Sequence, residues 1–190
     1  ARLLGQDARA VDALFHLPSG AIDRRLRPAI ADAPAGVTVT LKVTVEEHQS
    51  PPRNRPNAPH RVVVGDGTSW VTLVFFGRRG DLERQLPIGA QRWVSGKIEL
   101  YDGMRQMVHP DRIVDEAGLA RLPDVEPTYP LVEGVTQNLV TRAVRGALER
   151  LPDMPEWLDG SLLQARNWPG FTDALRALHA PLQPEDIAAE

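Results

Sequence analysis

The chain contains no cysteine, almost no lysine and no long apolar run. Without cysteine, the 190 residues can form neither a disulfide bond nor a thiolate-ligated metal site. No apolar segment approaches the length needed to cross a membrane, and no basic-then-apolar signal segment opens the sequence. These absences predict a cytoplasmic protein.

The sequence also lacks the common signatures of an enzyme. There is no G-x-x-x-x-G-K-[ST] phosphate loop, no nucleophile elbow, and no pair of histidines at metal-ligand spacing. We therefore predict no catalytic residue, no metal ligand and no cofactor within this chain.

Charge is distributed unevenly along the sequence. The net charge of −3 argues against a strong, indiscriminate nucleic-acid binder. Residues 1–114 nevertheless hold 16 basic and 12 acidic side chains, whereas residues 115–190 hold 6 and 13. If nucleic acid is bound, the first part is the expected surface. Of the 22 basic residues only Lys42 and Lys97 are lysine, a bias that suits phosphate contacts but that a GC-rich genome would also produce.

Five segments in the first part have the pattern of β-strands. The clearest is 37–45, where Val or Leu alternates with Thr or Lys over nine residues. The predicted strands are 37–45, 60–64, 69–76, 91–101 and 104–108. A short helix at 81–86 separates the third strand from the fourth. This order predicts a five-stranded Greek-key barrel of the OB type, with another small barrel or an open antiparallel sheet as the alternative.

Helices flank the predicted barrel, so the expected fold class is mainly β with helical segments (α+β). We divide the chain into an N-terminal helical flank (1–35), an OB domain (36–114), and a linker with a helical segment (115–190). The last part begins with a proline-containing linker and continues with predicted helices at 136–151, 155–166 and 171–179. Thr136 is the expected N-cap of the first of these.

The third predicted strand places an aromatic side chain on each face. Adjacent residues of a strand point in opposite directions, so Phe75 and Phe76 cannot both enter the core of a regular barrel. An outward Phe76 beside Arg78 and Arg79 could stack on an unpaired base while the arginines hold phosphate. The alternative is that Phe76 packs under the flanking helices.

Other candidate contacts lie on the fourth strand, at the turn after it and in the long first loop. One face of the fourth strand carries Trp93, Ser95, Lys97, Glu99 and Tyr101, which suits a nucleic-acid surface, although Trp93 could instead cover a helix. The predicted DNA-binding residues are Phe75, Phe76, Arg78, Arg79, Lys97, Tyr101, Arg105, Arg53 and Arg55.

Short motifs along the chain resemble the bacterial RecG family. The segment 14–18 (Leu-Phe-His-Leu-Pro) is followed by Asp23-Arg24, and the same order continues to the end of the chain. Further matching segments are 65–68 (Gly-Asp-Gly-Thr), 74–76 (Val-Phe-Phe), 96–97, 107–110 (Met-Val-His-Pro), 129–130, 133–134, 136–137 and 175–179. After the phenylalanine pair the family often has Asn, where this chain has Gly77.

The resemblance implies the wedge region of an ATP-dependent DNA helicase that reverses replication forks and moves Holliday junctions in DNA repair and recombination. It implies branched DNA and the parent protein's own C-terminal helicase domains as partners, with ATP and Mg used only by those domains. It also implies that the Phe75–Phe76 pair stacks on bases at the branch point. Two other functions stay open at this point: a general single-strand-binding OB domain and a protein-docking OB module.

Overall fold

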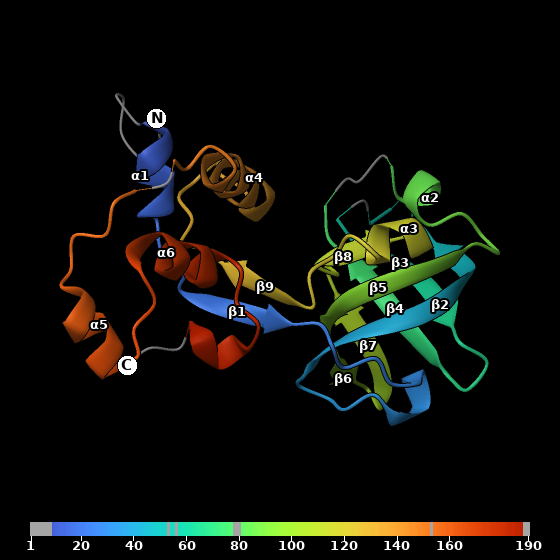
Figure 1. Ribbon diagram of the computed structural model, residues 1–190. Coiled ribbons are helices and arrows are strands. Elements are labelled where there is room, and N and C mark those ends of the chain that lie inside the picture. Colours follow the sequence, from blue (N-terminus) through green and yellow to red (C-terminus); the bar gives the residue numbers. More distant parts are fainter. Residues whose placement is uncertain (1–8, 53, 56, 78–80, 153, 188–190) are drawn as a thin grey trace. The chain divides into compact units, whose positions relative to one another are not determined.

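The computed structural model describes residues 9–52, 54–55, 57–77, 81–152 and 154–187, which form two compact units (Figure 1). One, here called the β unit, comprises Asp23–Asp124. The other, here called the helical unit, combines Ala1–Ile22 with Val125–Glu190. The β unit is therefore longer at both ends than the predicted domain 36–114, and the two predicted flanks belong largely to one unit.

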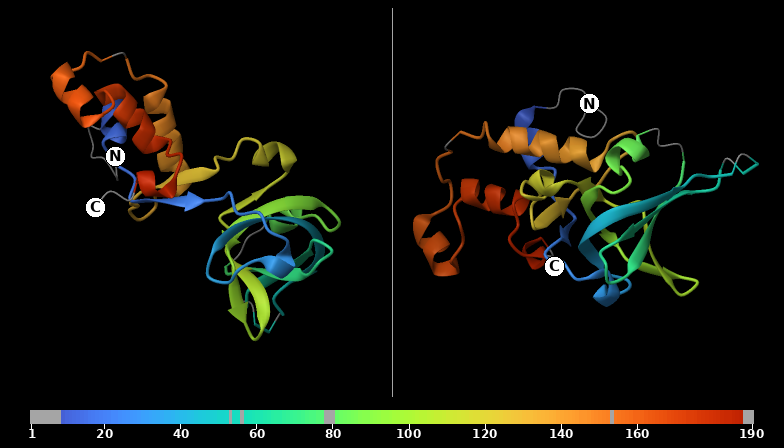
Figure 2. Two further views of the ribbon diagram at one scale, coloured as in Figure 1. Left: turned by 60° about the horizontal axis from the view of Figure 1, so that its bottom comes forward. Right: turned by 90° about the vertical axis from the view of Figure 1, so that its right-hand side faces the viewer.

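A seven-stranded sheet makes up most of the β unit. Its strands are β2 (Thr38–Gln49), β3 (His60–Gly65), β4 (Trp70–Phe75), β5 (Gln91–Lys97), β6 (Glu99–Tyr101), β7 (Met104–Val108) and β8 (Arg112–Val114). They lie in the order β6-β7-β4-β3-β2-β5-β8, and the strands curl round a shared interior (Figure 2, left). Among the described strand pairs of this sheet, only β4 and β7 run parallel. The mainly-β, α+β class is confirmed, whereas the hydrogen-bonded ladder is open, with β6 and β8 at its ends.

The predicted fourth strand is divided at Ile98. Before this residue β5 pairs with β2, and after it β6 pairs with β7. The Ile98 side chain is completely buried in the core, and its N–H donates to Val37 O at 3.0 Å. The chain bends here because it changes its pairing partner while it keeps an apolar residue inside.

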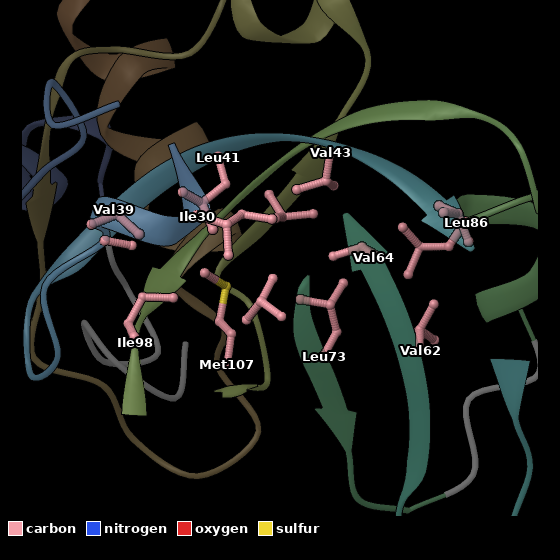
Figure 3. Packing of buried hydrophobic residues seen from close by; sticks show 14 of the residues in the cluster. Ile30, Val39, Leu41, Val43, Val62, Val64, Leu73, Leu86, Ile98 and Met107 are labelled. Carbon is pink, nitrogen blue, oxygen red and sulfur yellow. The ribbon is translucent and has the colours of Figure 1, made fainter. Parts of the chain in front are cut away.

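The interior of the β unit is filled by the inward residues of its strands (Figure 3). The alternation predicted for the first strand is confirmed for Val39, Leu41, Val43 and Val45, which are all buried, whereas Val37 precedes β2 and is exposed. Ile30 joins this core from a short 3-10 helix, η1 (Ile30–Asp32), outside the predicted domain. Burial of such side chains supplies about 1.5–3 kcal/mol each, which explains why residues 23–35 belong to this unit.

Two polar residues of the family-like motifs, Arg24 and Asp66, join separate segments of the β unit by hydrogen bonds. Arg24 is buried, and its Nη1 donates to Ser95 Oγ at 2.6 Å. Asp66 accepts hydrogen bonds from the Ile30 N–H at 2.7 Å and from Thr68 and Ser69. Partial burial alone would raise the pKa of Asp66, but these hydrogen bonds lower it to about 2. Asp66 thereby holds η1 over the core.

Residues 115–124, predicted as linker, also belong to the β unit. They form a one-turn helix, α3 (Glu116–Leu119), whose N-cap Asp115 accepts from the Gly118 N–H at 2.8 Å. Leu119 is buried, and α3 packs on β5 and β8. The other short helix of this unit, α2 (Leu82–Gln85), follows β4 as predicted.

The described part of the helical unit contains a two-stranded sheet, four α-helices and one 3-10 helix. Its elements are β1 (Gly20–Asp23), β9 (Val125–Thr128), α1 (Ala10–Leu14), α4 (Gln137–Leu148), α5 (Gly160–Arg166), α6 (Phe171–His179) and a short η2 (Pro184–Asp186). Thr136 is the N-cap of α4, as predicted. The helix predicted from 155 begins only at Gly160, because the Asp159 side chain caps it by accepting from two N–H groups.

A buried hydrogen-bonded chain joins three parts of the helical unit. His179 Nε2 lies 2.9 Å from Leu14 O, and Tyr129 Oη lies 2.9 Å from His179 Nδ1. Because a carbonyl can only accept, Nε2 carries the proton and Nδ1 accepts from the tyrosine hydroxyl. Burial lowers the pKa of His179 and raises the pKa of Tyr129 to about 12.

These pKa shifts predict how the stability of the helical unit depends on pH. Below the ordinary value of 6.5, the unfolded chain binds a proton at His179 more readily than the folded chain, so stability falls as pH falls. Above the ordinary value of 10.0, Tyr129 ionises more readily when unfolded, so stability falls as pH rises. Thermal unfolding of a variant with Trp70 and Trp93 changed to Phe, so that Trp157 and Trp168 report on this unit, measures both limbs.

The Tyr129→Phe variant should lose about 1–3 kcal/mol at neutral pH, because it leaves His179 Nδ1 buried without its donor. It should also lose the alkaline limb. Equal stability of the wild type on both sides of pH 6.5 would contradict a buried neutral His179.

Candidate nucleic-acid interface

The alternation of side chains along β4 decides which aromatic residues reach the surface. Val71, Leu73 and Phe75 point into the core, and the exposed fraction of Phe75 is 0%. On the opposite face, Trp70 is 66% and Phe76 52% exposed. The prediction that Phe76 points outward agrees with this geometry.

The predicted DNA contact of Phe75 is contradicted by the burial of its ring. The strand stays regular to its last residue, so the ring turns into the core and lies edge-on to the His109 ring, with centroids 6.3 Å apart. A base cannot stack on a ring that has no accessible face. Phe75 is a core residue, and its stacking role is not proposed again.

His109 holds Phe76 in place at the end of β4. The Phe76 N–H donates to His109 Nε2 at 3.3 Å, and the two rings are 5.7 Å apart. His109 is fixed in turn, since its N–H donates to Val74 O at 2.9 Å. Gly77 follows with φ +79°, a conformation that Gly adopts freely and Asn tolerates. The change from Asn to Gly at this position therefore fits the same backbone.

The predicted arginine contacts have different outcomes. Arg53, Arg78 and Arg79 lie outside the described residues. Arg55 is described and exposed, in the loop between β2 and β3. Arg105 is hydrogen-bonded to two backbone carbonyls: its Nη2 donates to Ala31 O at 2.7 Å and its Nε to Ala33 O at 3.4 Å.

The Arg105 guanidinium therefore satisfies carbonyl groups beside η1. This contact between segments about 70 residues apart could not be seen in the local sequence, and the phosphate contact of Arg105 stays a prediction.

The outer face of the fourth strand is divided between two environments. Trp93 donates from Nε1 to Glu116 at 2.9 Å, and Arg27 and Lys42 lie over its ring. Trp93 therefore covers α3 and the segment after β1, which was the predicted alternative to stacking. Lys97 and Tyr101 are exposed as predicted.

A groove on the outer face of β3, β4 and β7 was missed. It has a volume of about 630 Å³, and its walls include Arg61, Trp70, Thr72, Tyr101, Met104 and Gln106. Tyr101 was a predicted contact, but Trp70 and Met104 were not. The available signal was that Trp70 shares the outward face of its strand with Phe76.

Two other kinds of site were sought in the described part of the chain. Among these residues no group of three or more His, Asp or Glu side chains could hold a metal ion. None of the described helices is long and apolar enough to span a membrane.

The two phenylalanines should differ sharply in their effect on stability. Phe75→Ala empties a buried site and should cost about 3–5 kcal/mol. Phe76→Ala removes an exposed ring and should change stability by only about 0.5 kcal/mol. Chemical denaturation of the two variants measures the difference, and equal losses would show that Phe76 is also a core residue.

Relatives of this chain are helicases of the RecG type, although no family model matches the sequence. The ATP-dependent DNA helicase RecG of Acidithiobacillus ferridurans is 31% identical over 174 residues, which are 90% of this chain and 25% of the relative. That of Aquifex aeolicus is 28% identical and covers 93% of this chain and 23% of the relative. The chain thus spans about a quarter of the length of these relatives.

A solved structure supports the same relationship at the level of the fold. RecG bound to a three-way DNA junction matches 94% of this chain and 25% of that chain, with a TM-score of 0.72 and 21% identity. The order of family-like motifs, the similarity along nine-tenths of the sequence and this fold together make the chain similar to the N-terminal wedge region of RecG-type proteins.

Proposed function

We propose that this chain is the branched-DNA-binding wedge module of a RecG-type ATP-dependent DNA helicase. The observation that carries the proposal is the exposed Phe76 ring, held at the end of β4 at the position where the family resemblance expects a base-stacking residue. Stacking of a base on an aromatic side chain contributes about 1–3 kcal/mol. This gain would offset part of the stacking that a base loses when its duplex is split.

In the proposed mechanism the wedge is passive. The motor domains of the parent protein pull duplex DNA against a rigid β unit that admits only separated strands. Phe76 stacks on a base at the branch, while Arg78 and Arg79 next to it, and Arg53 and Arg55 in the loop between β2 and β3, hold phosphates. Lys97 adds positive charge on the same unit.

The parent protein would use this module in replication fork reversal, Holliday junction migration, DNA repair and recombination. ATP and Mg would be bound by its C-terminal helicase domains and by no residue of this chain. The branch would be recognised by its shape and not by its base sequence.

The rigidity of the wedge is best explained if the curled sheet acts as a five-stranded OB-type barrel. Two observations support this part of the proposal: β5 and β6 are separated only by Ile98, and together they pair with β2 on one side and β7 on the other. Counted as one bent strand, they would close the ladder. A closed sheet has no free edge on this path and resists deformation by a strand pulled across it.

The helical unit offers a surface for docking to the rest of the parent protein. Large apolar side chains are exposed around α5 and α6, namely Trp157, Trp168 and Leu182. A shallow pocket of about 690 Å³ beside α6 is lined largely by apolar atoms and includes Leu178 and Leu182. Exposed apolar groups of this kind mark interaction sites, and the C-terminal helicase domains are the proposed partner.

The proposal predicts that the 190-residue chain binds a fork more tightly than plain duplex of equal length, with affinity that falls as salt rises. Phe76→Ala should weaken fork binding about 5- to 150-fold, the range for one stacked base. Phe15→Ala is the matched control, because Phe15 is a similarly exposed ring in the helical unit. Fluorescence anisotropy at low salt measures both, with folding checked by circular dichroism.

Two results would contradict the proposal. One is a wild-type chain that binds forks and duplex equally well at low salt. The other is a folded Phe76→Ala variant whose fork affinity equals that of Phe15→Ala.

A further inference from the structure

We infer that the groove on the outer face of β3, β4 and β7 is a second DNA contact, which binds unpaired bases of a single-stranded arm by stacking on Trp70 and Tyr101. The inference rests on the proposed function, because it names the part of a branched DNA that this face takes. It concerns a place other than Phe76, at the opposite end of the same strand.

Trp70 is arranged as a stacking platform. It pairs in register with Gly65 on β3, and a methyl group built at Gly65 would come within 3.0 Å of Trp70 Cδ1. The indole ring therefore lies against bare backbone on one side, while two-thirds of the residue remains exposed. A ring that is already held flat loses little conformational entropy when a base stacks on its open face.

The opposite wall is formed by the turn between β6 and β7. Asp102 and Gly103 both have positive φ, 51° and 73°, as a two-residue hairpin turn of type I′ requires. The turn sets Tyr101 directly opposite Met104, and both are largely exposed. Rings and a thioether, together with Thr72 and Gln106, which pair two residues further along β4 and β7, give apolar faces and hydrogen-bonding edges suited to nucleobases.

Charge in and around the groove favours bases over phosphates as its occupant. Two cations, Arg61 and Arg105, and one anion, Asp102, line it, and the Arg105 guanidinium already donates to the carbonyl oxygens beside η1. At its borders Gln49 is bonded to Glu47 at 3.3 Å, and Gln106 to Glu99 at 3.3 Å, so further carboxylates lie near. A phosphate would meet little net positive charge here, whereas the uncharged face of a base meets no repulsion.

The position of the groove fits a strand that leaves the branch. Trp70 and Phe76 share the outward face of β4 and are six residues apart, which at about 3.3 Å per residue is about 20 Å. A single OB fold covers roughly 4–16 nucleotides of a single strand. A strand held at the branch by Phe76 could thus reach Trp70 within one such site.

Binding to two junctions tests the inference: a three-way junction whose arms are all duplex, and the same junction with one arm left unpaired. Trp70→Ala should weaken binding to the second junction about 5- to 150-fold, the range for one stacked base, and leave the first unchanged. The slope of affinity against salt should not change, because stacking releases no counterions. Trp157→Ala, an exposed tryptophan of the helical unit, is the control.

Gly65→Ala supplies an independent variant that keeps every aromatic residue. Its methyl group should push the Trp70 ring off the sheet and weaken binding to the unpaired arm in the same direction. Should Trp70→Ala fail to fold, Gly65→Ala and Tyr101→Ala decide the question, with folding of each confirmed.

The outcomes separate this inference from the proposed function. If the wild type shows no preference for forks, the proposed function is rejected, but the groove can still be tested with oligothymidylate. A lower affinity of Trp70→Ala for oligothymidylate would then support the groove alone. A normal fork preference combined with equal affinities of Trp70→Ala and Trp157→Ala for the unpaired-arm junction would overturn the inference alone. So would an equal loss on both junctions, or a reduced salt slope.

Discussion

The inward packing of Val71, Leu73 and Phe75 is the constraint on which the surface of the β unit depends. Side chains alternate along a strand, so a shift of register by one residue would bury Trp70, Thr72 and Phe76 and expose the three core residues. The completely filled interior prevents that shift. The two exposed rings are therefore consequences of the core, and the chain needs no separate device to present them.

The family-like motifs of this chain mainly hold separate segments of the structure together. Arg24 is buried against Ser95, Asp66 binds the backbone of Ile30, and His109 supports both phenylalanines of the pair. Gly96 leaves room for Met107, whose Sδ would lie 2.8 Å from a methyl group placed there. Similarity in these motifs therefore reports on the fold of the β unit more directly than on the residues proposed to contact DNA.

Periodicity in the sequence was sufficient to place five strand segments of the β unit, most clearly β2, where apolar residues alternate with Thr or Lys. It missed the three-residue β8 and the division of the fourth strand at Ile98. Local chemistry was also sufficient for the Thr136 cap and the Asp102-Gly103 turn. The same reasoning missed β9, which contains Pro127 and pairs with β1 about a hundred residues away. Such a pairing depends on the tertiary fold and leaves little local pattern.

The candidate site also combines features that the local sequence predicts with features that depend on the tertiary fold. The outward direction of Phe76 follows from alternation alone, but the burial of Phe75 depends on how regular the strand stays at its end. The hydrogen bonds of Arg105 were not predicted, because the fold brings their acceptors, the carbonyls of Ala31 and Ala33, to it. Trp70 was overlooked because exposure of an aromatic ring depends on its cross-strand partner, here a glycine.

We propose that the outer face of β4 and its neighbours contacts branched DNA. The most direct measurement is a map of backbone amide NMR shifts of the ¹⁵N-labelled chain as a three-way junction with one unpaired arm is added. The largest changes should fall in residues 69–77 and 101–109. Changes confined to residues 125–187, with none along β4, would contradict it.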